Sequence, residues 1–92
     1  MKFTEHRRKQ LVERGWQNVD GNDVVRQGKG RYTKRFGAVY LTLVIRSGEF
    51  LRAEFALHFQ GRELEFLRQC VKDTERAIDE VKALGPFEEL NQ

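Results

Sequence analysis

The chain has 92 residues, of which 39% are hydrophobic and 34% charged, and it carries a net charge of +3. This size and composition fit one folded domain with a modest core and argue against disorder. No apolar run approaches the ~18 residues of a membrane span, and the start "MKFTEHRRKQ" lacks the apolar segment of a secretory signal. We therefore expect a cytoplasmic protein with no membrane partner.

The charge is divided unequally along the chain. Residues 1–60 contain twelve Lys and Arg against six Asp and Glu, a net charge of +6, whereas residues 61–92 contain five against eight, a net charge of −3. Such segregation points to an anionic partner for the first part of the chain.

The first expected element is a helix over residues 4–14, "TEHRRKQLVER". Thr4 is a good N-cap residue, and Gly15 is a natural stop for a helix. The turn formers "DGND" follow, and the paired valines of "VVRQ" then favour a short strand over residues 23–27.

A second strand is expected over residues 31–45, with a bend or bulge at Gly37. The clearest pattern is the hairpin "AVYLTLVIRSGEFLRAEFALHF", whose second arm is expected over residues 49–59. A three-residue loop, Arg46-Ser47-Gly48, places both apolar rows on one face, since a one-residue slip would turn every side chain over. The resulting pairs are Leu43 with Leu51, Leu41 with Ala53, and Val39 with Phe55.

The last element is a long amphipathic helix over residues 62–84, ended by Gly85 and Pro86 and followed by a short tail over 85–92. Its apolar stripe recurs at alternating spacings of three and four and comprises Leu64, Leu67, Val71, Thr74, Ile78 and Val81. We expect this stripe to cover the apolar face of the hairpin. The predicted fold is one α+β domain over residues 1–92, in the order αβββα with about three antiparallel strands.

The residues that usually carry catalysis are scarce. His6 and His58 have no metal-ligand spacing, and the single cysteine, Cys70, falls on the apolar side of the long helix, where a buried structural thiol is expected. The segment Gly28-Lys29-Gly30 lacks the frame of a phosphate-binding P-loop. We therefore expect no enzymatic activity, no metal and no cofactor.

Three surfaces are candidates for binding. The stretch "VVRQGKGRYTKRFG" reads as a basic arm with Tyr32 as its stacking residue, and a basic cluster lies on the first helix. The third surface is the even-numbered sheet face with Tyr40, Thr42, Val44, Phe50, Arg52 and His58, on which Tyr40 and Phe50 are either packed under the first helix or exposed. The candidate partner-binding residues are Arg7, Arg8, Lys9, Arg14, Arg26, Lys29, Arg31, Tyr32, Lys34, Arg35 and Arg52.

The order αβββα is similar to that of double-stranded-RNA-binding domains. That family carries a basic run at the start of its second helix, where this chain has "GRELEFLRQC" with Glu63 and Glu65. It also has a GPxH-like loop between strands, which this chain lacks. The resemblance therefore concerns topology alone.

In size, charge and the overall look of "MKFTEHRRKQLVERGWQNVDGNDVVRQGKGRY", the chain resembles small phage-encoded anti-CRISPR proteins, in particular inhibitors of the type I-F surveillance complex. The resemblance implies a non-enzymatic inhibitor that occupies this crRNA-guided assembly and blocks binding of target DNA. The basic residues would then face the guide RNA or acidic parts of the complex, and the sheet aromatics would meet protein. The alternatives are a stand-alone RNA- or DNA-binding domain of a regulator and a protein-interaction module without nucleic-acid contact.

Overall fold

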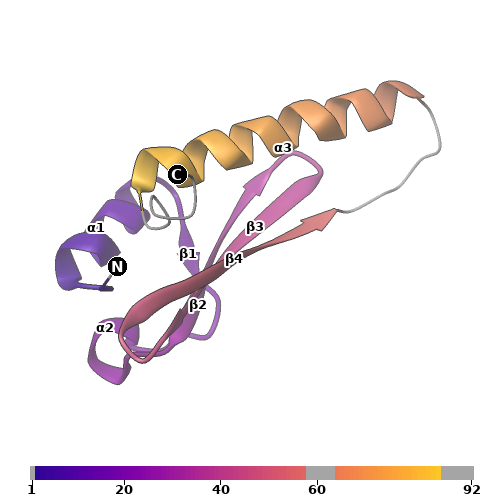
Figure 1. The fold of residues 1–92 in the computed structure, drawn as a ribbon. Coiled ribbons are helices and arrows are strands. Elements are labelled where there is room, and N and C mark those ends of the chain that lie inside the picture. The colour runs from indigo at the N-terminus through magenta and orange to yellow at the C-terminus, as the bar shows by residue number, and fades with distance from the viewer. Residues whose placement is uncertain (1, 58–63, 86–92) are drawn as a thin grey trace.

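The computed structural model describes residues 2–57 and 64–85 and contains three helices and a four-stranded antiparallel sheet (Figure 1). The sheet order is β1-β2-β3-β4, so each strand pairs with its neighbour in sequence. The α+β prediction is confirmed, with four strands in place of about three. In chain order the elements are α1 (Glu5–Glu13), β1 (Gln17–Asn18), α2 (Val24–Gln27), β2 (Gly30–Phe36), β3 (Val39–Arg46), β4 (Glu49–Leu57) and α3 (Leu64–Leu84).

The strand predicted at residues 23–27 is instead the short helix α2, so this prediction was wrong. The Asp23 side chain caps the helix by accepting a hydrogen bond of 3.2 Å from the Arg26 amide. Gly28 ends it in the left-handed conformation, with φ of 71°. Strong caps at both ends outweigh the strand preference of the two valines, and Val24 is buried in the core.

The predicted single strand over 31–45 is two strands, β2 and β3, because the expected bend at Gly37 is a full reversal. Phe36 pairs with Val39 across the Gly37–Ala38 turn, and Gly37 has a φ of 60°. This turn is fixed from outside the sheet: Asp73 of α3, itself buried, accepts a hydrogen bond of 3.2 Å from the Ala38 amide. A side chain at Gly37 would bring its Cβ into collision with the Asp73 carboxylate.

The β3–β4 hairpin has the predicted shared apolar face but not the predicted register. The loop is the two-residue turn Ser47–Gly48, whose φ angles of 55° and 75° fit the twist of the flanking strands. A bulge beside Val44 and Ile45 then restores the match of the apolar rows. The pairs are Leu43 with Ala53, Leu41 with Phe55, Val39 with Leu57 and Ile45 with Phe50. Each predicted partner on β4 was therefore two residues too early.

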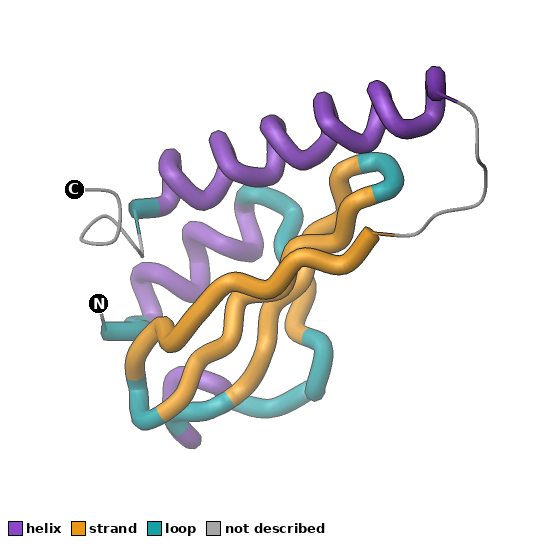
Figure 2. Tube along the Cα trace, turned by 45° about the vertical axis from the view of Figure 1, so that its right-hand side comes forward, coloured by secondary structure: helices purple, strands orange, loops and turns teal. Residues whose placement is uncertain are grey.

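The core lies on one face of the sheet, under α1 and α3 (Figure 2). Phe3, just before α1, packs against Tyr32 and Phe50 with ring centroids 5.5 and 5.3 Å apart. This core also contains the side chains of Leu11, Trp16, Phe36, Val39, Leu41, Leu43, Ile45, Ala77 and Leu84. No helix of the described residues covers the opposite face, which we call the open face.

The long helix α3 meets the sheet with a different stripe from the one predicted. Its buried residues are Cys70, Asp73, Ala77, Glu80 and Leu84, so the expected burial of Cys70 is confirmed. Leu64, Leu67, Val71 and Ile78 are instead 40 to 60% exposed. The predicted extension of α3 to residue 62, the end of the strand at 58–59 and the tail beyond Gly85 lie outside the described residues.

Candidate nucleic-acid interface

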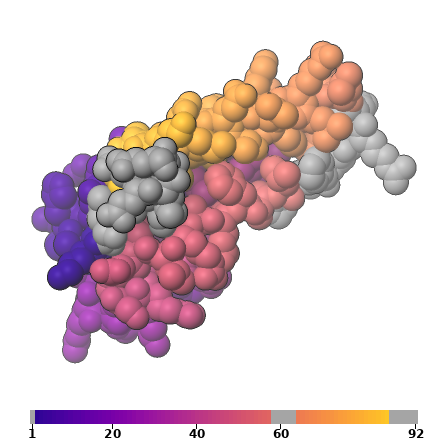
Figure 3. All heavy atoms as spheres, in the orientation of Figure 1, coloured from indigo at the N-terminus to yellow at the C-terminus, as the bar shows by residue number. Residues whose placement is uncertain are grey.

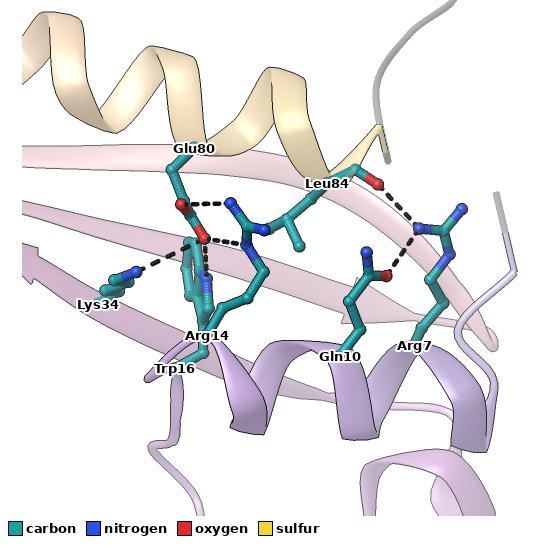
Figure 4. A network of polar contacts seen from close by, with 7 residues as sticks. All are labelled: Arg7, Gln10, Arg14, Trp16, Lys34, Glu80 and Leu84. Atoms are coloured by element: carbon teal, nitrogen blue, oxygen red, sulfur yellow. Dashed lines mark hydrogen bonds and ion pairs between the residues drawn. The ribbon is translucent and has the colours of Figure 1, made fainter.

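Three of the predicted binding residues hold the fold together (Figure 4). Arg14 grips the Glu80 carboxylate with two hydrogen bonds, of 2.7 and 2.9 Å, and the Lys34 ammonium lies 3.5 Å from the same group. The Trp16 indole also donates to Glu80, at 3.1 Å. Arg7 Nη1 donates to the Leu84 carbonyl at 2.8 Å, at the end of α3.

These contacts explain the electrostatic state of Glu80. Hydrogen bonding from Arg14 is the main cause that lowers the pKa of Glu80 from 4.5 to about 2, with Trp16 and Lys34 adding to it. Burial acts in the opposite direction but is outweighed. The side chains of Arg14 and Lys34 are therefore already engaged, and the cluster joins α1, β2 and α3.

The prediction that Tyr32 stacks on a partner was wrong. Tyr32 is only 3% exposed, because its position in β2 directs it to the core, where it contacts Phe3. Burial raises the pKa of its hydroxyl. The prediction assumed one continuous basic arm, but strand alternation sends Tyr32, Lys34 and Phe36 to the core side and Arg31 and Arg35 to the other.

Of the remaining predicted cations, Arg8 is paired with Glu5 on α1. Lys9 on α1 and Arg26 on α2 are exposed. These three cations therefore lie on helices and not on the sheet face.

The remaining predicted binding residues lie on or next to the open face. The strand registers place Arg31 beside Val44 and Val44 beside Arg52, and they place Arg35 beside Tyr40. The predicted even-numbered face is therefore real, except that the bulge turns Phe50 into the core, where it is 8% exposed. His58 lies outside the described residues. The side chains that define the open face are Arg31, Thr33, Arg35, Tyr40, Thr42, Val44, Arg46, Arg52, Glu54 and Ala56.

A shallow depression of about 320 Å³ lies at one end of the open face. Its cations are Lys29, Arg31, Arg46 and Arg52, and its carboxylates are Asp20 and Glu54. Arg31 donates to Asp20 at 2.7 Å, which lowers the pKa of Asp20, and Arg52 donates to Glu54 at 2.6 Å. Within the described residues, Lys29 and Arg46 have no carboxylate at ion-pair distance. The depression therefore keeps an excess of positive charge.

The other end of the open face carries an aromatic platform. The Arg35 guanidinium lies over the Tyr40 ring at 5.4 Å from its centroid. Next to it, the Thr42 hydroxyl approaches the Thr33 hydroxyl at 3.5 Å, and Thr33 donates to the Leu41 carbonyl. From Arg31 to Arg35 the strand advances ~13 Å, so a chain of a few nucleotides could cover both ends of the face.

Reasoning from sequence placed Tyr40 and Thr42 on this face, but it missed Arg46 and Thr33. It also assigned Arg31 and Arg35 to a separate basic arm. The alternation of β3 was visible, but the two-residue turn and bulge that align β3 with β4 were not. Arg46 follows the even-numbered row of that strand, and this pattern was the available signal.

Within the described residues, no three His, Cys, Asp or Glu side chains gather where a metal ion could bind. None of the described helices combines the length and apolar character of a membrane span. A comparison with protein-family models, curated proteins and solved structures found no match.

Proposed function

We propose that this protein is a non-enzymatic inhibitor that binds a crRNA-guided surveillance ribonucleoprotein and applies the open face of its sheet to single-stranded RNA in that assembly. The observation that carries the proposal is the pairing, on one uncovered sheet face, of a basic depression with an arginine–tyrosine stack. The choice of this assembly rests on the resemblance to type I-F inhibitors.

The shape of the surface favours single strands over duplexes. A sheet face has no projecting helix to enter a groove, but it offers a platform on which unstacked bases can lie. Arg35 and Tyr40 can stack with a base, and the neighbouring cations can neutralise phosphates. The threonine hydroxyls between them can hydrogen-bond to a base edge or a 2′-hydroxyl.

The experiment compares two double variants that remove the same charge. Arg35→Ala with Arg46→Ala alters the open face, whereas Lys9→Ala with Arg26→Ala alters exposed cations on α1 and α2. Binding of each variant to the purified type I-F complex is measured across a salt series. If each lost cation contacts a phosphate, the open-face variant lowers the logarithmic salt slope by ~0.7 per contact, and the control variant leaves it unchanged.

Equal losses from both variants would contradict the proposal, because binding would then depend on net charge rather than on this face. The same series with naked single-stranded RNA tests the alternative of a stand-alone RNA-binding domain. Tight binding to naked RNA together with no binding to the complex would favour that alternative. Absence of binding to both would refute the proposed function.

A further inference from the structure

The alternating apolar stripe of α3 has the spacing of a heptad seam. Within the described residues, Leu64, Leu67, Val71 and Ile78 of this seam are exposed, Thr74 is half-buried, and Val81 at one end packs against the core. Leu64, Val71 and Ile78 fall at the a positions of a heptad, and Leu67, Thr74 and Val81 fall at d. This spacing is typical of a helix that packs along its length against another helix. The seam spans residues 64–81, which is ~27 Å of helix.

The seam points sideways, along the plane of the sheet. Asp73 contacts the β2–β3 turn, Arg76 lies over the Phe36 ring, and Glu80 contacts Lys34 of β2, so this flank of α3 faces β2. At about 100° per residue, Leu67, Val71 and Ile78 lie on the opposite flank, the β4 side. Figure 3 shows α3 as a ridge along the edge of the molecule, above β4.

Edge strand β4 also exposes apolar side chains on the side of the sheet that the helices cover. Phe55 and Leu57 pair with Leu41 and Val39, which places them on the helix-covered face, yet they are 48 and 46% exposed. They form a second exposed apolar patch on this side of the sheet, and large exposed apolar patches mark interaction sites. The seam and this patch are on the opposite side of the sheet from the open face.

We propose that a second copy of this chain covers the seam, with the two α3 helices antiparallel. The charges beside the seam support this occupant. The e positions, next to a and d on the solvent side, are Arg68, Glu75 and Lys82. In one antiparallel register, Leu67 is level with Ile78 of the second copy and Val71 is level with Thr74 of the second copy. In this register Arg68 lies against Glu75 of the second copy. By symmetry, Glu75 of the first copy lies against Arg68 of the second.

The antiparallel arrangement also agrees with the position of the sheet. The g positions, on the other border of the seam, are Cys70, Ala77 and Leu84, all buried against the sheet. Antiparallel helices place g beside g and e beside e, so both sheets lie on one side of the helix pair. A parallel pair would place the exposed e side of one copy against the sheet of the other.

The first test is sedimentation over a concentration series. The wild-type chain is expected to show reversible dimerisation, and Val71→Glu is expected to weaken it by about tenfold or more. Val12→Glu is the matched control, because Val12 is similarly exposed on α1 but lies outside the seam. A chain that stays monomeric at every concentration, or a dimer that Val71→Glu and Val12→Glu affect equally, would overturn the proposal. A monomer that instead binds an amphipathic helix of another protein through the seam would also overturn it.

The second test fixes the register by exchanging charges. Arg68→Glu alone and Glu75→Arg alone each place like charges across the interface and are expected to weaken self-association. In a mixture of the two variants, the introduced glutamate of one copy faces the introduced arginine of the other. The unchanged Glu75 of the first copy likewise faces the unchanged Arg68 of the second, so the mixture is expected to recover a heterodimer. Failure of the mixture to recover association would overturn the antiparallel register.

The seam and the open face lie on separate surfaces of the molecule. RNA binding by the seam variants therefore reports on the proposed function independently of self-association.

Discussion

Replacing Glu80 by glutamine keeps the size of the side chain but removes the charge that holds α1, β2 and α3 together. The pKa of Glu80 lies at about 2, against an ordinary value of 4.5. At about 1.4 kcal/mol per pKa unit, this difference corresponds to at most about 3 kcal/mol of stability. The side chain of Arg14 is 39% exposed, so solvent screening reduces the expected loss to about 2 kcal/mol.

The loss should depend on pH in a defined way. Because the folded pKa of Glu80 is depressed, its contribution is fully present above pH 4.5 and is lost as the pH falls toward 2. The free energy of unfolding, measured by urea titration, should therefore differ between wild type and Glu80→Gln by about 2 kcal/mol at about pH 7. The difference should shrink steadily below pH 4.5. Asp73, whose pKa is also lowered, is present in both proteins and cancels from the difference.

Asp79→Asn is the matched control, because it removes one negative charge from the exposed side of the same helix. It should leave the free energy of unfolding unchanged within ~0.5 kcal/mol. Equal stability of Glu80→Gln and wild type near neutral pH, or a difference that stays constant as the pH falls to about 2, would refute the electrostatic explanation of the cluster.

Two further substitutions test the turn and the open face. Gly37→Ala should lower the free energy of unfolding by ~2 kcal/mol or more, because the alanine Cβ would collide with Asp73 and the φ at this position is 60°. An unchanged melting temperature would contradict the close contact between the β2–β3 turn and α3. Tyr40→Ala should weaken RNA-dependent binding by ~1–3 kcal/mol through the loss of a stacking surface, whereas Tyr32→Phe should leave it unchanged because Tyr32 is buried. A larger loss of binding for Tyr32→Phe than for Tyr40→Ala would contradict the assignment of Tyr40 as the stacking residue.

Much of the fold follows from periodicity. Strict alternation along β3 and β4 predicted the hairpin and its buried face, and the spacing of apolar residues predicted the long helix α3. The failures have local causes. Caps at Asp23 and Gly28 outweigh the strand preference of two valines. The sequence suggests a bend at Gly37, but the chain reverses there, because Asp73, 35 residues after Ala38, binds the turn.

The candidate site was harder to predict, because charge counts along the chain ignore the direction of side chains. Five of the predicted cations are neighbours in sequence from Arg26 to Arg35, yet they divide among α2, the core side and the open face. The apolar stripe of α3 shows a second limit of reasoning from the sequence. Its alternating spacing was recognised, but only the folded structure shows that Asp73, Ala77 and Leu84 are buried and that, of the predicted stripe, Val81 packs against the core.

Photo-crosslinking of the guide RNA to this protein, followed by mass spectrometry of the crosslinked peptides, would locate the RNA on the protein surface. If the RNA lies on the open face of the sheet, crosslinks are expected in the peptides that contain Tyr40 and Arg46, and they are expected to be lost in the Arg35→Ala with Arg46→Ala variant. Crosslinks confined to α1 and α2, where Lys9 and Arg26 are exposed, would contradict this placement of the RNA.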